Sequence, residues 1–177
     1  MAALTTAFFT AALALLGTII LSLWNRYRER SSIAGALAGE IGAYATLIDA
    51  PTSVVAYRKL ATFEHAIRRR RLRSMPKTPV GHPVFDKVAD KIGLLPSAES
   101  QTVSAIYNIV SGFRIIHASL SSPEMSEADD EVQIALLNKV AETIERYAPD
   151  AHELATRLNQ ISRESFWQFV QREVFGH

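Results

Sequence analysis

The chain opens with a long apolar stretch that holds no ionisable side chain from Met1 to Asn25. Its main part, Ala3 to Trp24, consists largely of Leu, Ile, Phe and Ala. As an α-helix rising about 1.5 Å per residue, this part is about 33 Å long, which matches a hydrocarbon core of about 30 Å. The sequence therefore predicts that residues 1–25 form a single transmembrane anchor.

A secretory signal peptide and a buried core helix are the alternatives to an anchor. A signal peptide carries basic residues before a shorter apolar run and ends at small residues. Here no basic residue precedes the run, and Trp24-Asn25-Arg26 follows it. A core helix rarely needs so long an uncharged run with three arginines directly after it. The anchor is therefore the favoured interpretation.

Residues that prefer the membrane surface follow the apolar stretch. Trp24 and Tyr27 are the aromatic types found at headgroup level, and Arg26, Arg28 and Arg30 lie among them. Because positive charge is retained on the cytoplasmic side, arginines after the helix place the N-terminus outside. We therefore expect these five residues at the membrane interface and residues 26–177 in the cytoplasm.

The roughly 150 residues after the anchor are enough for one domain with its own core. Apolar residues recur in them with helical spacing, and no segment alternates as a strand does. We expect an all-α fold, in which the N-terminal transmembrane helix is followed by a cytoplasmic bundle of four to five helices. The expected helices cover about 26–49 (continuing the anchor), 52–73, 84–92, 98–120, 126–148 and 150 to near the C-terminus.

Three glycines, Gly35, Gly39 and Gly42, lie in the helix that continues the anchor. They flank a narrow apolar stripe formed by Ile33, Leu37, Ile41, Tyr44 and Ile48. Each glycine costs a helix about 1 kcal/mol relative to alanine, so a compensating interaction is expected. Close approach of another helix is the favoured compensation, with a locally weak or bent helix as the alternative.

Charge is unevenly distributed in a chain whose net charge is only +1. Residues 26–95 carry 13 Lys and Arg against 6 Asp and Glu, whereas residues 121–177 carry 5 against 11. The domain is therefore expected to have a basic half, 26–95, and acidic C-terminal helices, 121–177. The near-neutral total gives no reason to expect a nucleic acid or an acidic substrate as the partner.

The most conspicuous polar feature is the run Arg68, Arg69, Arg70 and Arg71, with Arg73 after it. Four consecutive arginines cannot share one helix face, so most of them should be solvated. A second helix returning antiparallel to the first would bring them to the membrane, where each contributes about 1 kcal/mol near anionic lipid. Contact with anionic lipid or an acidic partner and a solvated helix end both stay open. The lack of interleaved aromatic residues argues against nucleic acid.

No motif for catalysis, cofactor binding or metal binding is apparent. The chain has no cysteine, and none of its five histidines has a second ligand at metal-binding spacing. His82 is expected in a loop and His117 on a helix surface. The aromatic patch formed by Phe166, Trp167, Phe169 and Phe175 fits core packing, with a partner-docking surface as the alternative. The sequence thus predicts no catalytic residue, no cofactor and no metal.

Two phrases of the sequence resemble an uncharacterised group of small, single-pass bacterial membrane proteins. They are LWNRYRERSSIAGALAGEIGAY, from Leu23 to Tyr44, and PVFDKVADKIGLLP, from Pro83 to Pro96; the following helix with Ile106-Tyr107 extends the likeness. In that group an N-terminal anchor runs into a helical domain. The resemblance implies a bacterial inner-membrane setting and brings neither an activity nor site residues.

These features together predict a non-enzymatic, membrane-anchored interaction protein that acts at the cytoplasmic face. It would be an accessory subunit, scaffold or assembly factor whose helical domain binds another protein. The alternative is an integral subunit of a larger membrane complex that contacts its partners through the transmembrane helix, with Gly17 and the Ala-rich face as the contact. An enzyme acting on membrane lipids is a third hypothesis, from a different class.

Overall fold

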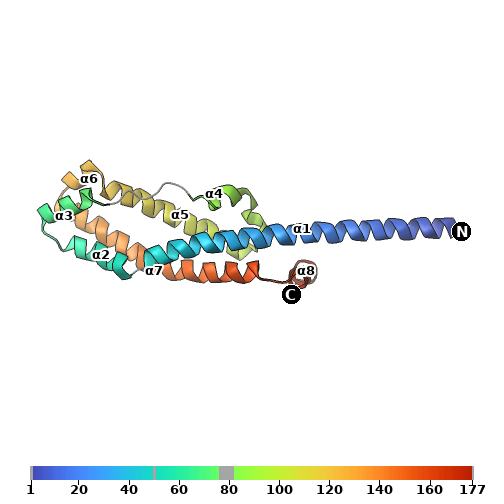
Figure 1. The fold of residues 1–177 in the computed structure, drawn as a ribbon. Helices are drawn as coiled ribbons and strands as arrows, with labels where there is room; N and C mark the ends of the chain where they lie inside the picture. The colour runs from blue at the N-terminus through green and yellow to red at the C-terminus, as the bar shows by residue number, and fades with distance from the viewer. Residues whose placement is uncertain (1, 50, 76–81, 177) are drawn as a thin grey trace.

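The computed structural model describes residues 2–49, 51–75 and 82–176, and these residues form helices and short connections without any strand (Figure 1). The all-α prediction is thus confirmed. The helices are α1 (Ala2–Asp49), α2 (Pro51–Ala61), α3 (His65–Arg73), α4 (Phe85–Val88), the 3-10 helix η1 (Ala89–Leu94), α5 (Ser97–Leu120), α6 (Pro123–Glu127), α7 (Asp130–Ser162) and α8 (Phe166–Phe175).

Helix α1 has two parts with different surroundings. Its N-terminal part protrudes alone from the molecule (Figure 1), and large apolar side chains such as Phe8, Leu13 and Leu21 are more than half exposed there. Its C-terminal part lies in the bundle, where Ile33, Leu37 and Ile41 are buried. The prediction that the helix runs unbroken to Asp49 is confirmed, since no proline interrupts it.

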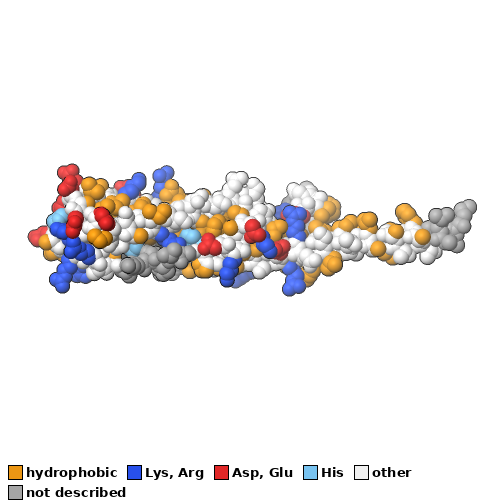
Figure 2. All heavy atoms as spheres, turned by 90° about the horizontal axis from the view of Figure 1, so that it is seen from above, with side chains coloured by type: hydrophobic (Ala, Val, Ile, Leu, Met, Phe, Trp, Pro, Cys, Tyr) orange, Lys and Arg blue, Asp and Glu red, His pale blue; other side chains and the backbone are white. Residues whose placement is uncertain are grey.

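The N-terminal part of α1 is long and apolar enough to cross a membrane. The candidate span covers Thr6–Thr46, with a mean hydropathy of 2.1 in its most apolar window, none of which is buried. Charged residues begin at Arg26, so only the part before Arg26 suits hydrocarbon. Figure 2 shows Lys, Arg, Asp and Glu side chains on the bundle, and apolar ones along the protruding helix.

The bundle is built around α7, which runs antiparallel to the other long helices. The C-terminal half of α7 packs along α1, and its N-terminal half packs along α2. Helix α5 lies against both halves of α7 (Figure 1). Two hydrophobic clusters result, one centred on Leu37, Leu154 and Leu158, the other on Leu72, Leu120 and Leu137.

Helix α7 continues through Pro149, where the sequence predicts a boundary. A proline removes the hydrogen bond to the carbonyl four residues earlier. Both Pro149 and Glu145 are exposed, so water can satisfy that carbonyl. Ala148 and Ala151 are buried on the opposite side and keep the helix packed across the proline. The predicted separation of 126–148 from the last helix is therefore wrong.

The true break lies between α7 and α8, and a polar side chain defines it. Ser165 caps α8 by accepting a hydrogen bond from the Gln168 amide, while the Gln168 side chain accepts one from the Ser165 amide. This reciprocal pair is a capping box, which occurs at helix N-termini. The Ser-x-x-Gln spacing in the sequence could have identified it.

The predicted helix 52–73 is divided into α2 and α3, and it does not return towards the protruding end of α1. Helix α2 begins with Pro51 and continues away from the N-terminus, so α3 lies at the far end of the bundle (Figure 1). About 30 residues of helix separate Arg30 from this end, or about 45 Å at 1.5 Å per residue. The expectation that the second helix returns antiparallel and brings the arginine run back towards the N-terminal part of α1 is therefore wrong.

Candidate functional site

The site that best combines unusual chemistry with accessibility is the junction of the protruding helix and the bundle, where α8 crosses α1. Trp24 and Tyr27 of α1 meet Phe166 of α8 with ring centroids 5.1 and 5.6 Å apart. Phe169, also on α8, is fully buried against Tyr27, with centroids 5.7 Å apart. Four aromatic rings therefore fasten the C-terminal helix to the level at which the apolar part of α1 ends.

A charged network lies directly below these rings. The Arg30 guanidinium donates to Glu173 at 3.3 Å and to Glu164 at 3.4 Å, and lies over the Phe169 ring at 5.4 Å. Glu164 also accepts from Arg172 at 2.7 Å. Arg30 is only 2% exposed, so it serves to hold α8 rather than to contact a membrane surface. The other residues expected at a membrane interface, Trp24, Arg26, Tyr27 and Arg28, lie on α1 next to this network, and their contact with a membrane stays a prediction.

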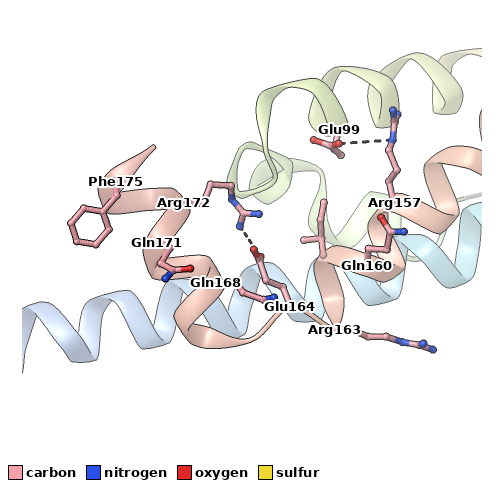
Figure 3. A pocket seen from close by; sticks show the side chains of 10 residues that line it. Glu99, Arg157, Gln160, Arg163, Glu164, Gln168, Gln171, Arg172 and Phe175 are labelled. Carbon is pink, nitrogen blue, oxygen red and sulfur yellow. Dashed lines mark hydrogen bonds and ion pairs between the residues drawn. The ribbon is translucent and has the colours of Figure 1, made fainter. Parts of the chain in front are cut away.

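Beside the network is an open groove between α5, α7 and α8 (Figure 3). Its lining side chains are mostly polar or charged: Glu99, Arg157, Gln160, Arg163, Glu164, Gln168, Gln171 and Arg172, together with Ile161 and Phe175. Arg157 lies 3.9 Å from Glu99 across it. The groove therefore combines charged and amide groups with the apolar stems of long side chains, a mixture that also occurs at protein–protein interfaces.

The three glycines of α1 have different surroundings. A Cβ at Gly35 would lie 3.4 Å from the Ser162 Cβ on α7, and one at Gly42 would lie 3.9 Å from the Ala155 Cβ. Gly39 has no neighbouring atom within 4 Å among those of the described residues. Helix α7 of the same chain therefore faces Gly35 and Gly42, but an alanine methyl at either position would make only an ordinary van der Waals contact. Close helix approach thus does not explain why these three positions are glycine.

The arginine run divides into a buried member and exposed ones. Arg68 is 1% exposed and bonds to Asp130 of α7, so it is not available to lipid or to a partner protein. Arg69 and Arg73 approach Glu127 at 3.9 and 3.5 Å. Arg70 and Arg71 are exposed beside a shallow hollow. The basic half thus meets the acidic helices within the molecule, and the expected surface reduces to the exposed members.

A polar cluster that the sequence did not suggest surrounds His82. The His82 ring bonds to the Tyr44 hydroxyl on α1 at 3.2 Å and to the Ser111 hydroxyl on α5 at 3.0 Å, and Arg114 approaches it at 3.4 Å. His82 is in a loop, as expected, but it is buried. A histidine bonded to a serine hydroxyl is also the arrangement of a catalytic base with its nucleophile. In catalytic triads a carboxylate orients the histidine, whereas here the Tyr44 phenol does, so the cluster does not form such a triad. The cluster joins α1, α5 and the His82 loop.

Acidification is expected to destabilise this cluster. Burial, with Arg114 nearby, lowers the pKa of His82 below its ordinary 6.5. The unfolded chain therefore takes up a proton before the folded one does, and stability falls as the pH drops below 6.5. We expect the thermal unfolding midpoint to decline in that range, and the decline to be smaller in H82Q. An equal decline in H82Q would contradict this assignment.

His117 is also buried, which corrects its expected place on a helix surface. Its ring bonds to the Tyr57 hydroxyl of α2 at 2.8 Å. The C-terminal aromatic patch is mixed: Phe169 is core, whereas Trp167 and Phe175 are 73% and 66% exposed. Among the described residues no group of three or more acidic, histidine or cysteine side chains could hold a metal ion.

Comparison of the chain with protein-family models, curated proteins and solved structures finds no match.

Proposed function

We propose that this chain is a non-enzymatic, membrane-anchored interaction protein whose helical bundle binds another protein beside the membrane. The N-terminal part of α1 is the single-pass anchor of a bacterial inner membrane, with its N-terminus outside. The bundle then lies on the cytoplasmic side, because Arg26 and Arg28 follow the span. Protease applied outside intact spheroplasts should leave the bundle whole, and its digestion would contradict this orientation.

The observation that carries the proposal is that one unbroken helix serves both as the apolar span and as a core helix of the bundle. Leu37 and Ile41 are fully buried in that bundle, only about four turns beyond Trp24. The buried Arg30 and the four-ring cluster make the joint between the two parts rigid. A bundle held in this way keeps a constant height and direction above the membrane, which favours docking of a partner.

The groove of Figure 3 is the surface we assign to the partner, because it is open, is lined by charged and amide side chains, and lies next to the proposed membrane surface. The position of Arg70 and Arg71 in the fold makes anionic lipid a weaker candidate as their partner than the sequence suggests. They are on α3, at the far end of the bundle (Figure 1), and about 45 Å of helix separates Arg30 from that end, which is several times the screening length of about 8 Å. The alternative, an integral subunit recognised through its transmembrane helix, requires specific contacts within residues 3–23.

Site-specific crosslinking with an exchanged anchor tests the proposal. A photo-crosslinking amino acid at Gln171, in the groove, is expected to give one defined protein adduct in native membranes. The same group at the exposed Asn108 on α5 serves as the control and should not give this adduct. The adduct should persist when residues 3–23 are replaced by an unrelated apolar span. Its loss on that exchange would favour the integral-subunit alternative.

A further inference from the structure

We propose that α8 is an interfacial helix, which lies along the membrane surface with its outer face in the headgroup layer. The partner is the lipid surface itself. This inference rests on the proposed membrane anchoring of α1 and adds a second contact between the chain and the membrane, about 140 residues further along the sequence.

Helix α8 has apolar side chains that the described part of the chain does not cover. Its inner side is occupied by Phe169, fully buried, and by Phe166, half-buried against Trp24 and Tyr27. Trp167 and Val174 are nevertheless 73% and 55% exposed. Their exposure needs an external apolar contact, because large apolar side chains grouped on a ten-residue helix are typical of membrane or protein interfaces.

The direction of this outer face follows from the contacts along α1. The contacts of α8 move from Phe169 to Phe166 as one goes along α1 towards its N-terminus. Arg30 contacts Phe169, Tyr27 contacts both rings, and Trp24 contacts Phe166. Successive residues of a helix are about 100° apart around its axis. Continuing the rotation that leads from Phe169 to Phe166, the next side chains around α8 are those of Val170, Val174 and Trp167. These side chains therefore face the protruding, apolar part of α1.

The polar side chains of α8 face the opposite way. Gln168 and Arg172 line the groove on the bundle side, and Arg172 is paired with Glu164 there (Figure 3). The apolar face of α8 is thus continuous with the uncovered apolar surface of α1, and its polar face is directed at the bundle. This is the arrangement of a helix that separates lipid from water.

The level and the direction of α8 fit the membrane surface. Trp24 is two residues before Arg26, the first charge in the chain, so its contact with Phe166 places α8 where hydrocarbon must end. Figure 1 shows α8 nearly end-on while α1 runs across the picture, so α8 crosses α1. A helix that crosses a membrane-spanning helix at this level lies along the surface. The exposed Arg26 and Arg28, directly after Trp24 on α1, suit anionic headgroups.

The chain has two tryptophans, Trp24 and Trp167, which makes a direct test possible. The full-length W24F variant, with Trp167 as its sole tryptophan, is placed in vesicles of phosphatidylcholine with a quarter phosphatidylglycerol. Lipids brominated near the headgroup end of their chains should reduce its emission to about half, as expected for a side chain at the headgroup–acyl boundary. Lipids brominated near the methyl end should quench it less.

The W167F variant, in which Trp24 alone emits, separates failure of this inference from failure of the anchor. Trp24 quenched and Trp167 unquenched would overturn the interfacial helix and leave the anchor in place. Neither tryptophan quenched would overturn both, because α1 would then not lie in the bilayer. Trp167 quenched more strongly by methyl-end bromine would also overturn the inference, since α8 would then be inserted and not lie on the surface.

A second measurement does not depend on the tryptophan substitutions. The chain has no cysteine, so V174C can be labelled with an environment-sensitive dye, and V132C on α7 is a matched control. The two valines are similarly exposed, 55% and 49%. In the same vesicles, nitroxide-bearing lipid should quench the dye at position 174 but not at position 132. Equal quenching at both positions, or at neither, would contradict lipid contact by α8, and leave a protein partner or a second copy as the occupant.

Discussion

Replacing Arg68 by alanine is expected to lower the free energy of unfolding of the bundle by about 3–5 kcal/mol, because a large buried side chain is lost and two buried polar groups lose their partner. Arg68 is the largest fully buried side chain of the described residues. Its guanidinium donates to the Ala61 carbonyl at 2.8 Å, to Asp130 at 2.5 Å and to the Gln133 side chain at 3.2 Å. A single side chain therefore joins α2, α3 and α7.

Two of these bonds satisfy buried groups that alanine would leave without a partner, whereas Asp130 is half-exposed and also bonds to His65. The Ala61 carbonyl is at the C-terminus of α2, where the backbone has no helical donor left. Gln133 is fully buried and uses its amide to hold the Met125 and Ala128 carbonyls at 3.0 Å, so loss of its bond to Arg68 also disturbs the segment around α6. The cost is therefore that of unsatisfied buried polar groups as well as of a lost ion pair.

The neighbouring arginines provide matched controls for this prediction. R70A removes the same side chain from the same helix at an exposed position and should leave the unfolding midpoint unchanged. Denaturant unfolding of the full-length protein in detergent, followed by helical circular dichroism, measures both variants. If R68A and R70A unfold at the same denaturant concentration, the buried role of Arg68 is wrong.

Arg68 also shows where a sequence-based argument reaches its limit. The sequence correctly indicates that four consecutive arginines cannot share one face, but not which of them is buried. That depends on the turn at 62–64, which ends α2 and directs Arg68 back under its last carbonyl. The acidic partner, Asp130, is 62 residues away in the sequence. Such a contact is set by tertiary packing and leaves no local signal.

Periodicity, by contrast, was sufficient for the part of α1 that lies in the bundle. The spacing of Ile33, Leu37 and Ile41 predicts the buried stripe of α1, and all three side chains are buried as expected. Proline was a less reliable indicator of where a helix ends. A helix can continue through a proline when the carbonyl that loses its hydrogen bond is exposed to water, as at Pro149. The junction with α8 could be predicted only in part. The aromatic patch is visible in the sequence. Which of its side chains is buried, as Phe169 is, and which is exposed, as Trp167 is, depends on the way α8 crosses α1.

Replacing Glu40 by alanine is the second substitution for which we expect a large effect, a loss of about 3 kcal/mol in the free energy of unfolding. Glu40 lies on α1 and accepts hydrogen bonds from the Val84 and Phe85 amides at 3.1 and 3.0 Å. Its carboxylate also accepts from the Tyr107 hydroxyl of α5. Tyr107 is 2% exposed, and burial, together with this bond, raises its pKa, so the phenol remains a donor.

The structural consequence of E40A should be concentrated in the segment that Glu40 holds. Without the carboxylate, two amides at the start of α4 and a buried phenol lose their acceptor, and the Phe85 ring loses the support that keeps it stacked on Tyr107 at 4.0 Å. We therefore expect the amides of Val84–Leu94 to exchange hydrogen faster than those of α7. E40Q should recover only part of the stability, because its amide nitrogen would face a second donor.

Glu29 on the same helix supplies the matched control. It forms an ion pair with Lys91 of η1 at 2.5 Å, but the two side chains are 43% and 48% exposed. An exposed pair contributes little, so E29A should leave both the unfolding midpoint and the hydrogen exchange of the α4–η1 segment nearly unchanged. Both glutamates connect α1 to the same segment and differ in burial and in the number of donors they satisfy. Equal effects of E40A and E29A would therefore show that Glu40 does not hold this segment, and that α4 is kept in place by its apolar contacts alone.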